Sequence, residues 1–350
     1  MQGMKDEFRA PDGAERPPRL WSWHSILSGV ITLLLFALMA GAVNWAGVWQ
    51  EILCSEKSYI LLGALCHYLT YPVRGLRWLH CLAHLPNKGG KSKFAQVVFF
   101  YNFVDNLVPA KLGDLYAAHL ARINFGVRRS EAIGSIVFMR MIDTWVILTL
   151  ALLASSMVLS AQLPDSVRWT LIGGVVMAAA STCIMLFFFF LDRSLPGWIP
   201  KRLGELVRAF RKGMWPRVEE LLPIMALTLT IWTLEALWVY LLACGFDLHL
   251  SASEALFLTM IPVLASAFPL TPSGAGLVEL TLFSCLRLVG VAAPLAESIT
   301  LLNRFIDYWL HIILGLMMWL FRNQLKLCTW REVSGGKVIG PAIMPMELVD

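Results

Sequence analysis

Long apolar stretches separated by short polar segments dominate the pattern of this chain. Uncharged runs cover residues 25–50, 169–191 and 255–278. Each is at least as long as the roughly 20 residues that an α-helix needs to cross a bilayer. The pattern predicts six full spans, at about 25–46, 57–79, 131–158, 168–191, 222–245 and 295–321. The chain is therefore expected to be an all-α polytopic membrane protein.

Two further apolar stretches, at about 94–124 and 252–289, are broken in the middle by proline and glycine. The breaks read NLVPAKLGD at 106–114 and PLTPSGAG at 269–276. Each arm has roughly 14–18 residues, and at about 1.5 Å per residue such a helix reaches only part way across a bilayer. The pattern favours two re-entrant helical hairpins, with pairs of short full spans as the alternative.

Lysine and arginine are distributed unevenly between the predicted loops. Most of the 29 basic residues, including Arg74 and Arg77, fall in segments that this topology places in the cytoplasm, as the positive-inside rule requires. Both termini are then cytoplasmic, as a tail over 1–24 and a tail over 322–350, on either side of a membrane domain over 25–321. The latter tail is expected to be irregular.

The same topology relates two parts of the membrane domain by inversion. The first hairpin enters from the cytoplasm and the second from outside, so repeat one (about 94–158) and repeat two (about 252–321) have opposite orientations. Secondary transporters are built from such inverted repeats, with a site near the bilayer midplane. A basic amphipathic segment at about 198–215 predicts a helix in the cytoplasmic interface, with a solvated loop helix as the alternative.

One motif occurs in both repeats. Gly126 precedes Arg140 and Asp143, and Gly290 precedes Arg304 and Asp307 at the same spacing, each time within R-x-x-D-x-W. A charge near the bilayer centre costs about 2.5–3.5 kcal/mol or more. Either each Arg–Asp pair joins the repeats, or each arginine holds an anionic group such as a lipid phosphate while the aspartate orients it. The two pairs are expected to face each other across one central polar site.

Other polar residues in apolar surroundings extend this candidate site. Substrate-binding candidates lie at the two hairpin tips and beside the second motif: Asn106, Lys111, Asp114, Ser273, Glu279 and Asn303. Two further intramembrane acids, Glu235 and Asp105, are candidates for proton coupling or for pairing with an arginine.

Composition and motifs exclude several classes of function. The chain is 57% hydrophobic and 15% charged, against about 25% charged in soluble domains. It lacks H-E-x-x-H, G-x-S-x-G and G-x-x-x-x-G-K-[ST], so no cofactor, metal or nucleotide site is expected and the protein is not expected to be an enzyme. The membrane asymmetry accounts for the net charge of +5, so a nucleic-acid partner is not expected.

Four segments give the chain a family resemblance: P-A-K-x-G-D at 109–114, R-x-x-D at 140–143, P-x-x-P-x-G-x-G-x-x-E at 269–279 and N-R-x-x-D at 303–307. In this order they resemble the lysylphosphatidylglycerol synthase/flippase transmembrane family. The resemblance implies a stand-alone member without the synthase domain, in the inner (plasma) membrane. It also implies a flippase-like transporter of a phospholipid or lipid-linked intermediate. By the same resemblance, the functional residues would be Asp114, Arg140, Asp143, Glu279, Arg304 and Asp307.

The expected partners are membrane lipids, anionic or modified at the head group. A homo-oligomer and an association with lipid-biosynthesis enzymes stay open. Two other functions also stay open. One is an accessory or scaffold subunit of a glycolipid, hopanoid or aminoacyl-lipid pathway. The other is a membrane-embedded enzyme that modifies a lipid, although the sequence offers no nucleophile or metal set for it.

Overall fold

The computed structural model describes most of the predicted membrane domain, but not the beginning of the chain. The described residues are 45–83, 90–107, 113–159, 164–191, 201–266, 274–322, 324–325, 332–334 and 337–339. The predicted N-terminal tail and nearly all of the predicted span at 25–46 lie outside this set, as do Lys111 and Ser273.

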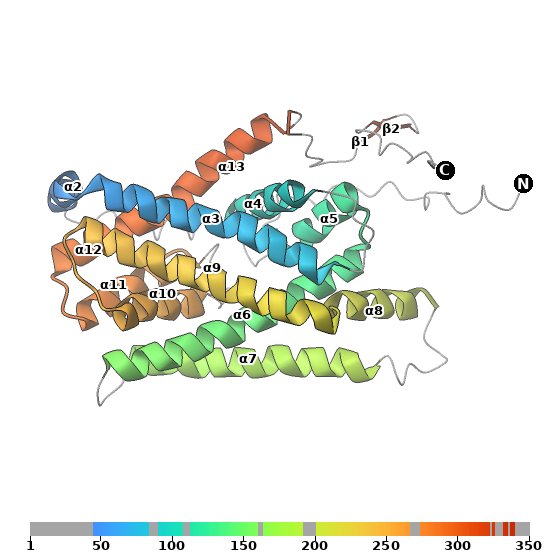
Figure 1. Ribbon diagram of the computed structural model, residues 1–350, viewed down its shortest axis with the longest axis horizontal. Coiled ribbons are helices and arrows are strands. Elements are labelled where there is room, and N and C mark those ends of the chain that lie inside the picture. Colours follow the sequence, from blue (N-terminus) through green and yellow to red (C-terminus); the bar gives the residue numbers. More distant parts are fainter. Residues whose placement is uncertain are drawn as a thin grey trace, which may run out of the picture.

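The described chain is helical, apart from one small pair of strands (Figure 1). Its helices are α2 (Trp45–Cys54), α3 (Lys57–Cys81), α4 (Lys91–Leu107), α5 (Gly113–Phe125), α6 (Arg129–Val158), α7 (Asp165–Leu191), α8 (Lys201–Met214), α9 (Val218–Gly245), α10 (Ala252–Ser266), α11 (Leu277–Leu288), α12 (Ala293–Arg304), the π-helix η4 (Phe305–Leu310) and α13 (His311–Leu320). The last three follow one another without a break, over Ala293–Leu320.

Four helical segments of the described chain are long and apolar enough to cross a membrane. They are α6, α7, α9 and the continuous segment Ala293–Leu320, and they correspond to four of the six predicted spans. Helix α3 has the length, at 25 residues, but its polar side chains lower its mean hydropathy. A predominantly helical fold with four candidate spans in the described residues is therefore confirmed, while the count of six and the re-entrant hairpins stay predictions.

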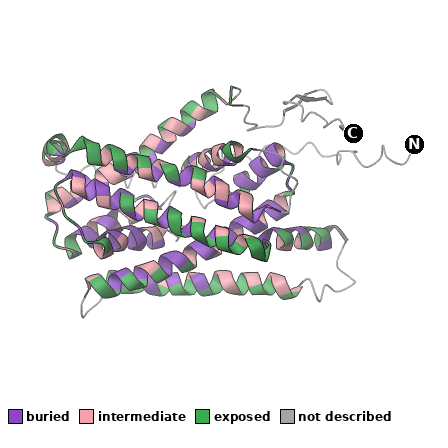
Figure 2. Cartoon of the chain, in the orientation of Figure 1, coloured by how far each residue is buried: buried purple, intermediate pink, exposed green. Residues whose placement is uncertain are grey.

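Helices α3 and α9 lie side by side along the middle of the molecule (Figure 1). Their contact is close because Gly63 of α3 leaves room for the ring of Trp238, which is 2% exposed. Both helices also keep an exposed apolar side, which includes Leu61, Leu65 and Leu222, and buried and exposed residues alternate along them (Figure 2). Helix α7 lies at the edge of the bundle and buries only a few of its residues, as expected for a helix that faces lipid.

The two broken segments each consist of a pair of helices that pack against each other. Helix α4 packs on α5, and α10 packs on α11. Each second arm ends at the glycine of the repeated motif: Gly126 after α5 has φ 71°, and Gly290 after α11 has φ 87°. Glycine adopts this left-handed backbone without the strain of a Cβ atom. The repeated glycine therefore marks the same kind of turn in both repeats, between the second arm and the helix that carries the motif.

Helix α8 packs against the first turns of α6. A Cβ atom on Gly134 would collide with the carbonyl oxygen of Phe210, and one on Gly213 would collide with that of Glu131. The two backbones thus touch where both helices carry glycine, while Leu206 of α8 remains 55% exposed. The predicted amphipathic helix is present, and its location in the membrane interface stays a prediction.

The C-terminal tail contains a short antiparallel pair of strands, β1 (Glu332–Ser334) and β2 (Lys337–Ile339). The prediction of an irregular tail is therefore wrong for these residues.

Candidate functional site

The arginine of each repeated motif pairs with an acid from the preceding broken segment. Arg140 Nη2 lies 3.0 Å from Oδ1 of Asp114, in the first turn of α5. Arg304 Nε lies 2.7 Å from Oε1 of Glu279, in the first turn of α11. Both pairs connect the second arm of a broken segment to the motif helix of its own repeat. The two repeats thus share one arrangement of charge as well as one sequence motif.

The aspartate of each motif contacts α3 instead. Arg77 donates two hydrogen bonds to Asp143, of 2.6 and 2.9 Å, and His67 Nε2 lies 3.4 Å from Oδ1 of Asp307. The arginine and the aspartate of each motif therefore contact different partners instead of pairing with each other. In each motif the arginine contacts the second arm of the broken segment and the aspartate contacts α3. The two side chains point to different helices because a different helix packs beside each of them.

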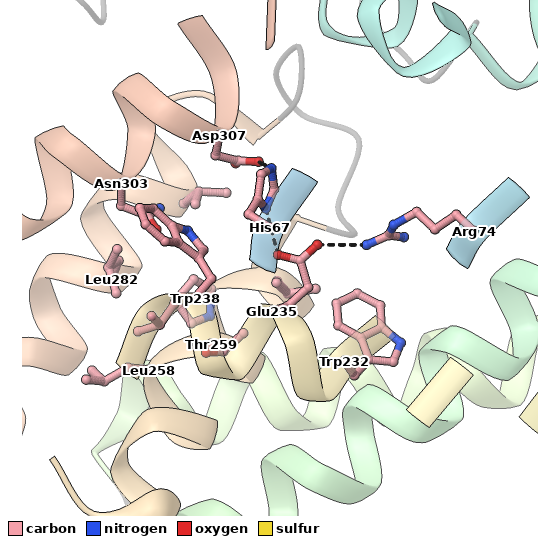
Figure 3. Close-up of a pocket in the computed structure, with 14 residues that line it drawn as sticks. His67, Arg74, Trp232, Glu235, Trp238, Leu258, Thr259, Leu282, Asn303 and Asp307 are labelled. Atoms are coloured by element: carbon pink, nitrogen blue, oxygen red, sulfur yellow. Dashed lines mark hydrogen bonds and ion pairs between the residues drawn. The ribbon is translucent and has the colours of Figure 1, made fainter. Parts of the chain in front are cut away.

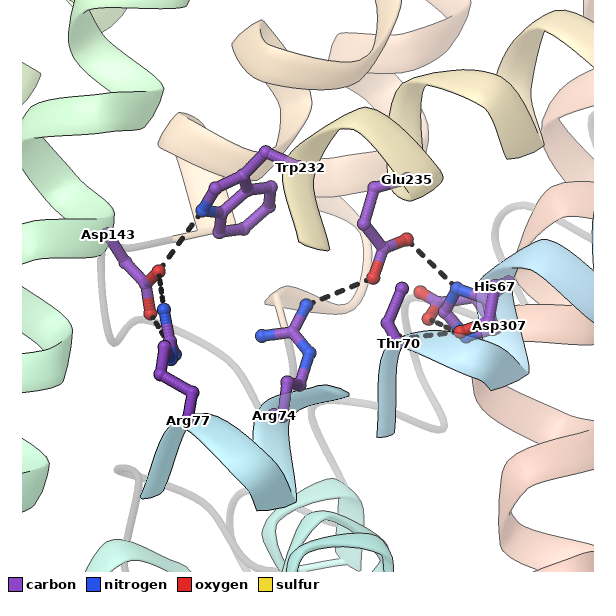
Figure 4. Close-up of polar contacts among 8 residues, drawn as sticks. All are labelled: His67, Thr70, Arg74, Arg77, Asp143, Trp232, Glu235 and Asp307. Carbon is purple, nitrogen blue, oxygen red and sulfur yellow. Dashed lines mark hydrogen bonds and ion pairs between the residues drawn. The ribbon is translucent and has the colours of Figure 1, made fainter. Parts of the chain in front are cut away.

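A chain of polar contacts links the aspartates of the two motifs through α3 and α9 (Figure 4). At one end, the indole of Trp232 donates to Asp143 at 3.1 Å, and the guanidinium of Arg74 lies 5.4 Å from the centre of the Trp232 ring. Arg74 Nη2 then donates to Glu235 at 3.0 Å.

The other half of this chain passes through a histidine. Glu235 Oε2 lies 2.9 Å from Nδ1 of His67, whose other ring nitrogen faces Asp307. An imidazole with a carboxylate at each nitrogen has the surroundings of the doubly protonated cation. We call the six residues the polar chain: His67, Arg74, Asp143, Trp232, Glu235 and Asp307.

A cavity of about 190 Å³ opens beside one part of the polar chain (Figure 3). Its polar wall contains His67, Arg74, Glu235 and Asp307, together with Asn303. Apolar residues of α10 and α11, the second broken segment, form the opposite wall. The cavity therefore lies between the central helix pair and repeat two.

The second motif also contains an irregularity of the backbone. Its aspartate lies within the π-helix η4, whereas the first motif lies within a regular α-helix. Tyr68 on α3 donates to the carbonyl of Ile306 at 2.9 Å, and Tyr308 of η4 donates to the carbonyl of Asn106 at 3.0 Å. Single π-helical turns are frequent at functional sites, and this one touches both the central helix and the first broken segment.

Comparison with known proteins places this arrangement in a family. A family model described as the lysylphosphatidylglycerol synthase TM region matches residues 25–315. The chain belongs to this family. The match includes both motifs, both broken segments and the whole polar chain.

Curated relatives support the same assignment. A UPF0104 membrane protein of Methanocaldococcus jannaschii is 29% identical over 227 residues, which are 64% of this chain and 97% of the relative. One from Methanothermobacter thermautotrophicus is 24% identical over 311 residues, covering 81% and 90%. One from Pyrococcus horikoshii is 21% identical over 326 residues, covering 84% and 96%. The protein is thus a membrane protein of the lysylphosphatidylglycerol synthase transmembrane family.

Among the remaining candidates in this family member, Asn303 lines the cavity, and Asn106 contributes its backbone carbonyl to Tyr308. Asp105 lies against Gly113 across the first break, where a Cβ atom would collide with its side chain. Lys111 and Ser273 lie outside the described residues. In the described part of the chain, no cluster of three or more His, Cys, Asp or Glu residues could hold a metal ion.

Sequence reasoning missed the contribution of α3 and overlooked Trp232. The charge pattern puts Arg74 and Arg77 in a cytoplasmic segment, whereas in the structure both lie in the helical bundle, with Arg77 only 4% exposed. A signal was available, since His67 and Arg74 are seven residues apart and therefore lie on one face of a helix. Their acidic partners are far away in sequence, so the spacing alone could not identify them.

Proposed function

We propose that the protein moves an amphipathic lipid, a phospholipid or a lipid-linked intermediate, between the two leaflets of the plasma membrane. The observation that carries the proposal is the polar chain. It crosses four helical elements of an apolar bundle and links the aspartates of both repeats. Intramembrane charges are costly and commonly mark transport pathways. A lipid head group needs such a polar route, while its acyl chains can remain in the surrounding lipid.

The proposed topology has six full spans and two re-entrant hairpins, with both termini in the cytoplasm. Helices α4, α5, α10 and α11 have 17, 13, 15 and 12 residues. At about 1.5 Å per residue, each is shorter than the roughly 30 Å of a bilayer core. Re-entrant arms would expose helix ends and broken backbone near the midplane, where transporters of this architecture bind their substrates.

The two equivalent ion pairs differ in accessibility, which supports alternating access. Arg140 and Asp114 have side chains that are 44% and 25% exposed, whereas those of Arg304 and Glu279 are 4% and 2% exposed. In a transporter of inverted repeats, one repeat opens while its counterpart closes. The accessible pair would receive a head group in this state, and the sealed pair would become accessible in the opposite state.

The test is lipid translocation in proteoliposomes with a fluorescent anionic phospholipid and an impermeant quencher. The wild-type protein is expected to move the probe, and Arg140→Ala and Arg304→Ala to abolish this movement. Arg168→Gln, on the exposed start of α7, is the control for lost charge. Equal rates in wild type and both alanine variants would overturn the assignment of these sites. A wild-type protein that moves no lipid would overturn the transport proposal and favour a scaffold role.

A further inference from the structure

Arg74 differs from the neighbouring Arg77 in how many hydrogen bonds its guanidinium makes. Arg77 gives two hydrogen bonds to Asp143 and a third to Thr228. Among the described residues, Arg74 gives one hydrogen bond, from Nη2 to Glu235, and it lines the cavity. A guanidinium carries five N–H donors in a planar fork, so Arg74 can still bind an oxyanion with two of them.

The cavity beside Arg74 has the size of a head group and not of a whole lipid. Its volume of about 190 Å³ lies below the roughly 300–1,000 Å³ of pockets that enclose drug-sized ligands. Asn303 adds an amide to the polar wall, and Leu258 and Leu282 lie on the apolar wall. A polar group attached to acyl chains that remain outside would suit this shape.

Charge balance sets a condition on what can bind. The charged side chains facing the cavity are Arg74, Glu235 and Asp307, and His67 adds a second positive charge when both of its ring nitrogens are protonated. With His67 protonated these charges cancel, and uncompensated charge is expensive inside a bundle. An added anion therefore needs one added proton.

Several titratable groups around the cavity could receive that proton. Arg77 and Asp143 neutralise each other at the far end of the polar chain. Tyr68 and Tyr71 contact His67 but already carry their phenolic protons, and the imidazole of His311 stacks on Tyr71. The geometry favours Glu235 as the group that takes up the proton, because a bound anion would replace the carboxylate of Glu235 on Arg74.

We propose that Arg74 binds the phosphate group of the transported lipid, and that this phosphate displaces Glu235, which takes up a proton as it leaves. The proposal rests on the proposed function and names the residue that selects the head group. Glu235 is then an internal competitor for Arg74. Release of the lipid returns Glu235 to Arg74 and frees the proton, so movement of the anion is linked to movement of a proton.

The experiment measures binding in detergent micelles across a range of pH, without requiring transport. The ligands are phosphatidylglycerol, diacylglycerol with the same acyl chains, and glycerol 3-phosphate. Wild type is expected to prefer phosphatidylglycerol over diacylglycerol, with an affinity that rises as the pH falls, by up to about tenfold per pH unit for one linked proton. Arg74→Gln should lower this affinity at least tenfold, and the exposed Arg168→Gln should not change it.

Glu235→Gln is the decisive variant, because it mimics the protonated competitor. It should bind phosphatidylglycerol more tightly than wild type at neutral pH, and its affinity should no longer depend on pH. A purely structural ion pair predicts the opposite, a loss of binding in Glu235→Gln as large as in Arg74→Gln, and that result would overturn the proposal. Thermal unfolding of each variant confirms that only folded protein is compared.

The remaining outcomes separate this proposal from the proposed function. Equal affinity for glycerol 3-phosphate and phosphatidylglycerol would overturn the lipid assignment in favour of a soluble phosphate. Unchanged binding and translocation in Arg74→Gln would overturn this site and leave the transport function standing. Arg74-dependent binding in a protein that moves no lipid would overturn the transport function and leave the site standing.

Discussion

Arg77 and Asp143 join α3 to α6 through two parallel hydrogen bonds, of 2.6 and 2.9 Å, inside the helical bundle. Their side chains are 5% and 11% exposed. Nη1, which donates the shorter of these bonds, also donates to the hydroxyl of Thr228 on α9 at 3.0 Å. The pair therefore holds three helices together and places the first motif beside the central helix pair.

Arg77→Ala is expected to destabilise the protein strongly. It leaves the carboxylate of Asp143 buried without its cation, which typically costs about 3–5 kcal/mol. Thermal unfolding in detergent measures the loss. The double variant Arg77→Met/Asp143→Asn should be more stable than Arg77→Ala, because no charge is then left unpaired. If the double variant is the less stable of the two, the pair does not act through its buried charge.

The glycines that precede the two motifs are expected to respond alike to substitution. Nothing lies within 4 Å of a Cβ atom at Gly126 or Gly290, yet both have positive φ. Alanine should therefore cost about 1–2 kcal/mol at either position through backbone strain alone, and asparagine should cost less. Gly90→Ala is the matched control, because its Cβ would also meet open space at an ordinary φ. Unequal losses at Gly126 and Gly290 would contradict the equivalence of the two turns.

The close contact of α6 and α8 predicts a contrast among glycines. Gly134→Ala and Gly213→Ala should both destabilise the protein, since each Cβ meets a backbone carbonyl that cannot move aside easily. Gly204 lies in the same helix α8, and a Cβ atom there would have only Nη2 of Arg208 nearby, at 3.7 Å. Gly204→Ala is therefore the contrasting variant. It should be neutral or stabilising by up to about 1 kcal/mol, because alanine favours a helix over glycine. Similar melting temperatures for all three variants would contradict this packing.

Sequence periodicity anticipated much of the fold for a physical reason. Long apolar runs such as 169–191 have few alternatives to a membrane helix, because every backbone group must be satisfied within the segment. The glycine turns and the duplicated motif were also visible, since a left-handed turn restricts the residue type. The π-helix at 305–310 was not predictable, because no residue type marks it.

The partners of the motif charges could not be read from the sequence. Asp114 and Glu279 were candidates, but their pairing with Arg140 and Arg304 depends on how each broken segment folds back on its motif helix. The contacts of α3 with Asp143 and Asp307 depend in the same way on packing across the bundle. Local spacing fixes which face of a helix a side chain occupies and leaves the neighbouring element undetermined.

The same substitution in the two copies of the motif should have different effects on stability. Arg304 lies beside Glu279 with both side chains nearly inaccessible, and it also stacks 4.3 Å above the ring of Tyr308. Arg304→Ala would leave Glu279 as an uncompensated buried charge, at a cost of about 3–5 kcal/mol. Arg140 is 44% exposed, so Arg140→Ala should cost about 1 kcal/mol or less.

This difference makes Arg140→Ala the cleaner test of function, because it should remain folded while losing translocation. Unfolding of both variants in the same detergent checks the contrast, with Glu279→Gln and Asp114→Asn as the reciprocal changes on the acidic side. Glu279→Gln should again cost more than Asp114→Asn, since the buried Arg304 would lose its counter-ion. Equal costs in the two repeats would mean that their ion pairs are equally accessible, and would remove the asymmetry on which alternating access rests.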